Sequence, residues 1–480
     1  MESQAGTARN TDPAADLSAL LAAQRRAFRA HGAPALGTRL ARLETLAGLL
    51  SGHRDAFVKA ISADFGHRSR HETLIADIVA TLEAIRHTRR NLPRWMKPER
   101  RGVSINFLPG RAKVVHQPLG VVGIISPWNY PVQLAFSPLA AAMAAGNRVM
   151  LKPSEFTPAT SDLMARLLGE AFPADEIAVV TGGPEVGRAF SELAFDHLLF
   201  TGATAVGRHV ARAAAANLVP VTLELGGKSP VIVDDNYPMD RAAAAIMTGK
   251  MLNAGQTCIA PDYVLVPHAR IDAFVHEAQR AVRTLYPTLK DNPDYTSVVN
   301  QRHYDRLHGL IADARDKGAR IVEINPANEH LDQQAHHKIA PTLVLGATPD
   351  MKVMQDEIFG PVLPVQGYGA LEDAFEAVAA GDRPLALYYF GLDPARQERV
   401  LNETISGGVT INDTLMHVAQ EDLPFGGVGA SGMGAYHGRD GFLTFSHRKG
   451  VFVQSKFSLT RLLRPPYGKL AERALARMTR

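Results

Sequence analysis

One cysteine stands out among the residues that could do chemistry. Cys258 is the only cysteine in the 480 residues and lies in the stretch "GQTCIA". A disulfide within the chain is therefore impossible, and a lone cysteine is either a small buried hydrophobic residue or a nucleophile. By residue type alone the buried interpretation is the commoner one, so the rest of the sequence has to decide between them.

A glutamate supplies the matching candidate base. Glu224 lies near the end of the apolar run "PVTLEL", which is followed by Gly226 and Gly227. A carboxyl group in apolar surroundings has a raised pKa, which suits a general base. The two glycines would let a ligand approach the backbone closely. The alternative is a half-exposed glutamate without a catalytic role.

Other polar residues and glycines lie in turns that could bind a substrate or cofactor. Asn129, in "SPWNYP", could donate to an oxygen that becomes negative in a transition state, or could bond its own backbone in a turn. Lys152 and Glu155, in "KPSE", could bond ribose hydroxyls or form a solvated charge pair. Gly202 and Gly207, in "FTGATAVG", could expose N–H groups to a phosphate at a helix N-terminus, or serve only as caps.

The predicted strands place these residues at one edge of a sheet. The pattern predicts strands over 121–125, 148–152, 177–181, 197–201 and 220–225, separated by helical segments. Alternating strands and helices indicate an α/β fold with a parallel sheet covered on both faces. Such sheets bind ligands beyond the carboxyl ends of their strands, which is where the candidate residues follow.

The remaining segments complete a two-lobed architecture. Residues 17–90 have helical apolar spacing, and "GVSINFLPGRAKVVHQP" predicts a hairpin around Pro109-Gly110. A second α/β series runs from 230–235 to 407–413, so a second lobe should meet the first in a cleft. The stretch "GVGASG" (Gly427, Gly429, Gly432) fits a dinucleotide-binding pattern, but it follows no strand and opens no obvious helix. We interpret it as a flexible loop.

Composition excludes several classes of protein. Hydrophobic residues at 46% and charged residues at 21% are ordinary for a globular protein, and a net charge of +4 without a basic stripe gives no sign of nucleic-acid binding. The polar start of the chain does not resemble a secretory signal, and no apolar run is long enough to span a membrane. With a single cysteine, these features favour a cytoplasmic location.

The C-terminal tail carries a basic amphipathic pattern. Leu470, Ala474, Leu475 and Met478 fall on one helical face among Arg473, Arg477 and Arg480. Such a helix can lie on a membrane surface, but a solvated helix or one that packs on another subunit is more common.

Taken together, the motifs resemble the aldehyde dehydrogenase family over nearly the whole chain. "LELGGKS" and "GQTCIAP" look like its glutamate and cysteine signatures, and "PWNYP", "KPSE", "FTGATAVG", "QDEIFGP" and "PFGGVGASGMG" occur in the family's order. The short N-terminal region, "AYHGRDGFLTFSHRKGVF" and "RPPYG" are most similar to the class 3 branch and to bacterial coniferyl aldehyde dehydrogenases. Seven motifs in order make the nucleophile interpretation of Cys258 the stronger one.

The resemblance implies a division of the chain into three parts. Residues 1–102 and 120–225 would form an NAD-binding domain, and 226–430 an α/β catalytic domain. A small β oligomerisation arm with the C-terminal tail would comprise 103–119 and 431–480. The class 3 relatives imply a homodimer, with strands near 103–118 and in "VFVQSKF" (451–457) covering their edges against a partner.

The resemblance also implies a mechanism and a cofactor. Cys258 would add to the aldehyde, Asn129 would stabilise the oxyanion, and Glu224 would activate water to hydrolyse a thioester. NAD would be the cofactor, with NADP tolerated, and no metal is implied. The implied cofactor-binding residues are Lys152 and Glu155 at the adenosine ribose, Gly202 and Gly207 at the pyrophosphate, and Glu357 and Phe359 at the nicotinamide ribose.

Several alternatives stay open from the sequence. A cysteine hydrolase or acyl transferase without redox chemistry would need a histidine base, for which His437 is the nearest candidate. A second alternative is a coenzyme A-acylating relative, but such enzymes generally lack the glutamate that is present here as Glu224. A third is a non-catalytic binding protein on the same fold. Trp128, Tyr130, Ile259 and Met416 are candidates for an apolar tunnel, which suits coniferaldehyde or medium- to long-chain aliphatic aldehydes.

Overall fold

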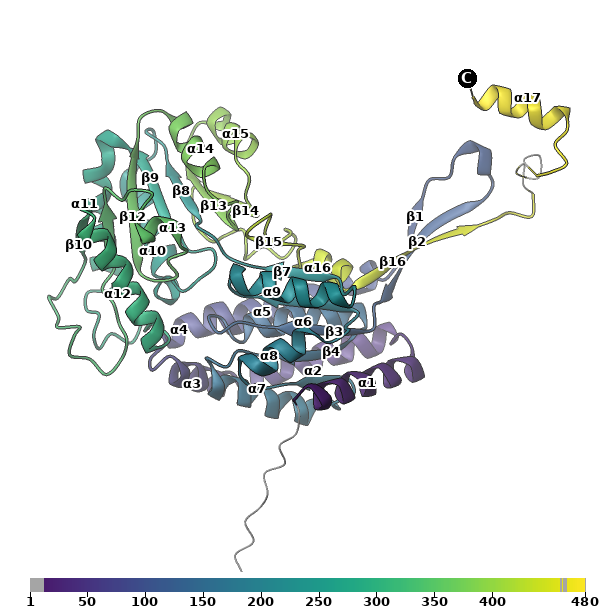
Figure 1. Ribbon diagram of the computed structural model, residues 1–480, viewed down its shortest axis with the longest axis horizontal. Coiled ribbons are helices and arrows are strands. Elements are labelled where there is room, and N and C mark those ends of the chain that lie inside the picture. The colour runs from purple at the N-terminus through teal and green to yellow at the C-terminus, as the bar shows by residue number, and fades with distance from the viewer. Residues whose placement is uncertain (1–12, 458–459, 461–463, 480) are drawn as a thin grey trace, which may run out of the picture.

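The computed structural model describes residues 13–457, 460 and 464–479. The polar start of the chain, residues 1–12, and Arg480 of the tail pattern lie outside these residues. In the described part, two large sheets lie side by side, and a thin β arm projects away from them (Figure 1).

A helical layer forms the N-terminal part. It contains α1 (Pro13–His31), α2 (Leu36–Gly52), α3 (Arg54–Asp64), α4 (Arg70–Glu72), the π-helix η1 (Thr73–Val79) and α5 (Ala80–Trp95). The predicted helices in 17–90 are therefore confirmed. The π-helix was not predicted, because its apolar spacing differs little from that of an α-helix.

The first large sheet contains the strands predicted from alternation. Its order is β15-β7-β6-β3-β4-β5, and all of its strands are parallel except β15. The bounds are β3 (Val121–Ile125), β4 (Arg148–Lys152), β5 (Ile177–Val179), β6 (His197–Thr201), β7 (Val221–Glu224) and β15 (Gly432–Met433). Strand β5 is shorter than expected, because it is an edge strand that ends before Gly182-Gly183-Pro184.

Helices cover both faces of this sheet, as the buried strands require. Val122 and Ile124 of β3 pack in one core, whereas Val121 packs in a second core on the opposite face. The covering helices include α6 (Gln133–Ala145), α7 (Pro158–Ala171), α8 (Pro184–Ser191) and α9 (Thr204–Ala216). These elements fix the strand ends from which the candidate residues project.

The stretch "GVGASG" is a tight turn and not the flexible loop that we expected. Its last glycine begins β15, where Gly432 pairs with Glu224 in antiparallel register. Side chains are excluded by the close backbone packing, since a Cβ atom on Gly427 would collide with the carbonyl of Ser431. The next helix, α16 (Gly438–Thr444), starts well beyond the turn. The turn therefore braces the strand that carries Glu224.

The second large sheet is the expected second α/β unit. Its order is β10-β11-β12-β9-β8-β13-β14, parallel apart from β10. The strands are β8 (Pro230–Val233), β9 (Tyr263–Pro267), β10 (Arg320–Glu323), β11 (Thr342–Leu345), β12 (Val362–Tyr368), β13 (Ala386–Phe390) and β14 (Gly408–Ile411). The helices are α10 (Met239–Met251), α11 (Ile271–Leu285), α12 (Gln301–Asp316), α13 (Lys352–Gln355), α14 (Leu371–Ala379) and α15 (Pro394–Glu403).

The projecting arm is a three-stranded antiparallel sheet of order β1-β2-β16. The hairpin is present, but its first strand is β1 (Glu99–Arg101), ahead of the segment expected, and residues 105–107 form a 3-10 turn. Strand β2 (Arg111–Pro118) pairs with β16 (Ser446–Val453) along its whole length, Arg111 opposite Val453. Strand β16 therefore ends where β2 begins, and 454–457 do not continue it as expected.

The tail ends in the expected helix, α17 (Lys469–Met478), beyond the arm (Figure 1). Leu470, Leu475 and Met478 are exposed on it. None of the helices in the described ranges is long and apolar enough to cross a bilayer.

Candidate active site

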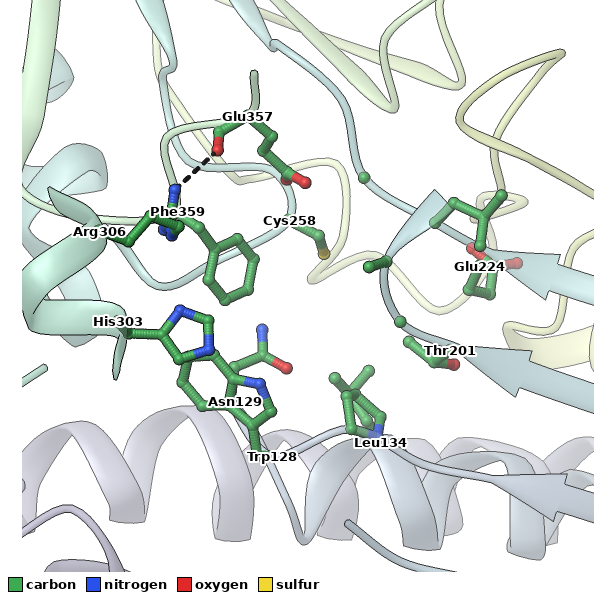
Figure 2. Close-up of a pocket in the computed structure, with 15 residues that line it drawn as sticks. Trp128, Asn129, Leu134, Thr201, Glu224, Cys258, His303, Arg306, Glu357 and Phe359 are labelled. Atoms are coloured by element: carbon green, nitrogen blue, oxygen red, sulfur yellow. Dashed lines mark hydrogen bonds between the residues drawn. The ribbon is translucent and has the colours of Figure 1, made fainter. Parts of the chain in front are cut away.

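A cavity of about 210 Å³ lies where the carboxyl ends of the first sheet face the second (Figure 2). Six predicted site residues line it: Asn129, Gly202, Glu224, Cys258, Glu357 and Phe359. The other three predicted site residues do not line the cavity: Lys152, Glu155 and Gly207. The tertiary structure thus brings together most of the predicted set.

Cys258 lies just beyond a sharply turned loop at the end of α10. Three consecutive residues, Asn253, Ala254 and Gly255, have positive φ angles of 53°, 51° and 75°. Two of them are not glycine, and such backbone strain costs about 1–3 kcal/mol per residue unless surrounding contacts impose it. The loop is therefore a conformation that other parts of the protein must hold in place.

Apolar surroundings keep the thiol protonated. Burial raises the pKa of Cys258 to about 12, and the nearby carboxyl groups of Glu357 and Glu224 act in the same direction. The nucleophilic thiolate forms only if a proton acceptor lies nearby or if a bound cation lowers the pKa. Glu224 and Glu357 are therefore the candidate bases for the thiol proton.

Glu224 has the environment that a general base needs. It ends β7 and its exposed fraction is 2%. Burial raises the pKa of its carboxyl group well above the usual value. Neither carboxyl oxygen has a hydrogen-bond partner among the described residues. The group therefore has a high affinity for a proton and both oxygens available for one.

Asn129 projects from the turn after β3 toward the nucleophile loop. Its Nδ2 atom donates to the carbonyl of Gln256 at 3.1 Å, so the side chain does not bond its own backbone. In Figure 2 the amide nitrogen lies on the side of Cys258. One N–H of the amide is used by Gln256, which leaves the second for a substrate oxygen.

The charged side chains of Lys228 and Arg306 hold the segment that contains Glu357 and Phe359. The Lys228 ammonium bonds the Asp262 carboxylate and the carbonyl of Val353, the latter at 2.8 Å. Arg306 donates to the carbonyl of Ile358 at 2.6 Å. Phe359 itself has a φ of 50°. Lys228, Asp262 and Arg306 were missed from the sequence, although Lys228 lies within "LELGGKS" and Asp262 directly follows "GQTCIAP".

The Glu357 carboxyl group lies against the glycine pair that follows Glu224. A Cβ atom on Gly226 would collide with it, and the Gly227 N–H donates to it. Burial and the neighbouring Asp262 raise its pKa to about 8. Its Oε1 atom has no partner within the described part of the chain. An unpartnered carboxyl oxygen on a residue that lines the cavity fits a ribose hydroxyl.

Lys152, the last residue of β4, forms a 2.8 Å ion pair with Glu155. Lys152 is buried, so the pair is not simply solvated. Gly207 is inside α9, where a Cβ atom would collide with Leu225. Its role in the structure is close packing of this helix on the segment after β7.

Of the four residues proposed for an apolar tunnel, one, Trp128, lines the cavity. Tyr130 and Ile259 are buried and Met416 is exposed. The Tyr130 hydroxyl bonds the Thr257 hydroxyl at 2.6 Å, so this tyrosine supports the nucleophile loop.

Two histidines have different positions relative to the cavity. His303 lines it beside Trp128, with a ring-centroid distance of 5.1 Å, and was missed from the sequence because a histidine inside a helical pattern gives no signal. His437, the candidate base of a hydrolase, instead stacks on Phe425 with a centroid distance of 4.8 Å. Burial lowers its pKa to about 4.

The carboxyl edge of the first sheet carries groups that suit a dinucleotide. Gly202 and Ala203 form the cavity wall just before the first residue of α9, Thr204, and no side chain caps that helix. Its free N–H groups suit a pyrophosphate. Lys152 ends strand β4 and Glu155 follows it, whereas Glu357 lines the cavity, so the site offers hydroxyl-binding groups in two places.

Comparison with known proteins agrees with this arrangement. The model of the "Aldehyde dehydrogenase family" matches residues 2–451. A "Probable coniferyl aldehyde dehydrogenase" of Caulobacter vibrioides is 57% identical over 462 residues, 95% of each chain. "Aldehyde dehydrogenase family 3 member A2" of Mus musculus is 40% identical, over 92% of this chain and 90% of the mouse protein. The resemblance to the family and to these two branches is confirmed.

Solved structures give the same result for the fold. The substrate-bound Staphylococcus aureus AldH superposes with a TM-score of 0.90 and 38% identity, over 96% of this chain and 99% of the other. The Mycobacterium tuberculosis aldehyde dehydrogenase complexed with NAD+ has a TM-score of 0.83 and 30% identity, over 93% and 92% of the two chains. The predicted α/β fold is confirmed.

Proposed function

Because this chain belongs to the aldehyde dehydrogenase family and is thus an NAD(P)-dependent enzyme that oxidises an aldehyde, we propose that Cys258 and Glu224 carry out the reaction through a thioester. The observation that supports this most is the convergence of Cys258, Glu224 and Asn129 on one cavity, from three separate segments of the chain.

The first half of the reaction uses the thiol. Cys258 loses its proton to a neighbouring carboxylate and adds to the carbonyl carbon, so that a C–S bond forms and the carbonyl electron pair moves to oxygen. The free N–H of Asn129 and the backbone N–H of Cys258 donate to that oxyanion. NAD, when bound, supplies the acceptor for the hydride that leaves as the oxyanion collapses.

The second half uses the glutamate. Glu224 takes a proton from water, the hydroxide adds to the thioester, and the C–S bond breaks to give a carboxylic acid and the free thiol. The raised pKa of Glu224 supports this role, because such a carboxylate removes a proton from water more readily than an exposed one does. No metal ion is needed in either half.

The cofactor proposal is NAD in preference to NADP. The Glu155 carboxylate would accept a bond from the adenosine 2′-hydroxyl and repel a 2′-phosphate. Lys152 would bond the same ribose, Gly202 and Gly207 would border the pyrophosphate, and Glu357 with Phe359 would hold the nicotinamide ribose. The NAD+ complex of the Mycobacterium tuberculosis relative supports the choice of NAD.

The substrate proposal is an aromatic aldehyde of the coniferaldehyde type. The name of the Caulobacter relative supports it, and so do the flat walls that Trp128 and Phe359 contribute to the cavity. A medium- or long-chain aliphatic aldehyde is the competing substrate class. The two are separated by kcat/KM across a panel.

The assembly and location proposals follow the sequence. The outer edges of β1 and β16 are unpaired in the described sheet, so a homodimer that covers them would remove a liability of open strands. With its single cysteine the chain suits the cytoplasm. The tail helix α17 would contact solvent or a second subunit and not a membrane.

The test of the function is direct. Absorbance at about 340 nm should rise when NAD and coniferaldehyde are added to the wild-type enzyme. The Cys258→Ser variant should produce no NADH. Thiol-dependent ester hydrolysis without any NADH from any aldehyde would instead identify a hydrolase, and neither activity would identify a binding protein.

A further inference from the structure

Three charged side chains from the N-terminal helical layer are buried behind the cavity. Arg68, Glu72 and Asp77 have exposed fractions of 2%, 8% and 0%. Glu72 directly precedes the π-helix η1, and Asp77 lies within it. Buried charges are costly unless they are paired and hydrogen-bonded, so their partners indicate what they do. Local π-helices also occur frequently at functional sites.

Arg68 and Asp77 fasten the turn that carries Asn129. The Arg68 guanidinium contacts the Asp77 carboxylate at 3.1 Å and donates to the carbonyl of Asn129 at 3.0 Å. The other Asp77 oxygen accepts from the backbone N–H groups of Val132 and Gln133, at 3.0 and 3.1 Å. Both ends of the turn are thus held by one ion pair.

Glu72 fastens the loop that leads to Cys258. One carboxyl oxygen accepts from the backbone N–H of Asn253 at 3.1 Å, and the other accepts from the Thr296 hydroxyl at 2.5 Å. Asn253 is the first left-handed residue of the strained loop, just past the end of α10. Its N–H is buried there and needs an acceptor, which Glu72 provides.

The Asn253 side chain joins the two fastenings. Its Nδ2 atom donates to the carbonyl of Asn129 at 3.0 Å and to the carbonyl of Gln256 at 3.1 Å. The Asn129 amide also donates to the carbonyl of Gln256. Arg68 and Asn253 therefore both donate to the Asn129 carbonyl. These shared bonds couple the turn that carries Asn129 to the loop that leads to Cys258.

From this network we propose that Glu72 and Arg68 are positioning residues of the oxyanion site, which set the distance between the Asn129 amide and the Cys258 N–H. The inference rests on the function proposed above and deepens it. Oxyanion stabilisation depends on donor placement, and a misplacement of about 1 Å can cost about 10²-fold in rate. Neither residue touches the substrate, so both act through the backbone.

The central test is Glu72→Gln, because glutamine keeps the shape but replaces one acceptor oxygen with an NH₂ group. Either Asn253 or Thr296 then loses its acceptor. The matched control is Asp64→Asn. Asp64 is in the same helical layer and accepts from the Thr160 N–H at 2.9 Å and the Thr160 hydroxyl at 2.6 Å, but it caps α7.

Three measurements separate positioning from stability. Both variants should lower the melting temperature by similar amounts. Only Glu72→Gln should slow the NADH burst with NAD and aldehyde, by about tenfold or more, with KM values within about twofold of wild type. Only Glu72→Gln should also change the rate at which iodoacetamide alkylates Cys258, followed by intact mass; this reaction needs no aldehyde turnover.

The outcomes are distinguishable. A Glu72→Gln burst rate and alkylation rate equal to those of Asp64→Asn would overturn the inference. A wild-type protein without aldehyde oxidation, but with altered alkylation in Glu72→Gln alone, would overturn the proposed function and support the positioning of the loop. If Glu72→Gln does not fold, Thr296→Val removes one of the two bonds to Glu72, together with the acceptor of the Ser69 N–H, and should slow the burst about two- to fivefold. An unchanged burst would overturn the inference.

Discussion

The nucleophile loop and the end of β7 hold the two proposed catalytic side chains in opposite ways. The loop before Cys258 is strained at Asn253 and Ala254, and buried side chains from distant segments hold its backbone. Glu224 is the last residue of the regular strand β7, and its carboxyl oxygens have no partner among the described residues. The nucleophile, which must form a bond at one carbon, is held by its loop, whereas the carboxyl group proposed to take a proton from water has no protein hydrogen bond to hold it.

The largest loss of activity should come from a change at the nucleophile loop. Cys258→Ser replaces a thiol with a far weaker nucleophile and should lower both the NADH burst and steady turnover by at least about 10³-fold. Rapid mixing with NAD and aldehyde measures both. Because serine is nearly isosteric, the melting temperature should stay close to wild type. A full burst in this variant would remove the nucleophile assignment.

The second-largest loss of activity should come from a change at Glu224 and should affect only the hydrolysis of the thioester. Glu224→Gln should lower steady turnover by about 10²–10⁴-fold, because it removes the base. The burst should still approach one NADH per active subunit, after which the enzyme stalls as a thioester visible by intact mass. A missing burst in this variant would move Glu224 to the first half-reaction, because the buried Cys258 thiol, whose pKa is raised to about 12, needs a neighbouring base to ionise.

A third variant tests whether Glu357, which packs against Gly226, contacts the cofactor. Gly226→Ala should displace the Glu357 carboxyl group, since its Cβ atom would collide with that group. We expect KM for NAD to rise by about tenfold, with less effect on kcat. Gly48→Ala is the control, because nothing lies within 4 Å of its Cβ position. Equal KM values in the two variants would contradict the placement of Glu357 at the cofactor.

The smallest effect should come from Glu155, which is proposed to contact the adenosine ribose, far from the reacting carbon. Glu155→Gln removes the charge that repels a 2′-phosphate, so the NAD/NADP ratio of kcat/KM should fall by roughly tenfold. Steady-state kinetics with both cofactors measures it. Glu170→Gln, an exposed partner of Arg166 in the last turn of α7, should leave the ratio unchanged. An unchanged ratio in Glu155→Gln would exclude the ribose role.

The sequence predicted best what repeats along the chain. The strands that precede Asn129, Gly202 and Glu224 were located from alternating apolar runs, because a buried parallel strand is apolar on both faces. The arm was predicted less well. Its first strand lies at 99–101, ahead of the expected segment, and β16 ends at Val453, since pairing with β2 sets both limits. "GVGASG" was misjudged because glycines signal close packing and flexibility alike.

The amino-acid sequence by itself determined which chemical groups are available and that the strand ends would present them. It contains one thiol, an apolar-flanked carboxyl group and the turns that follow each strand. Only the tertiary structure decided what holds them. Glu72 and Asn253 are 181 residues apart, and Arg68 and Asn129 are 61 apart. Contacts over such separations leave no periodic signal, because they depend on how the helical layer packs against both sheets.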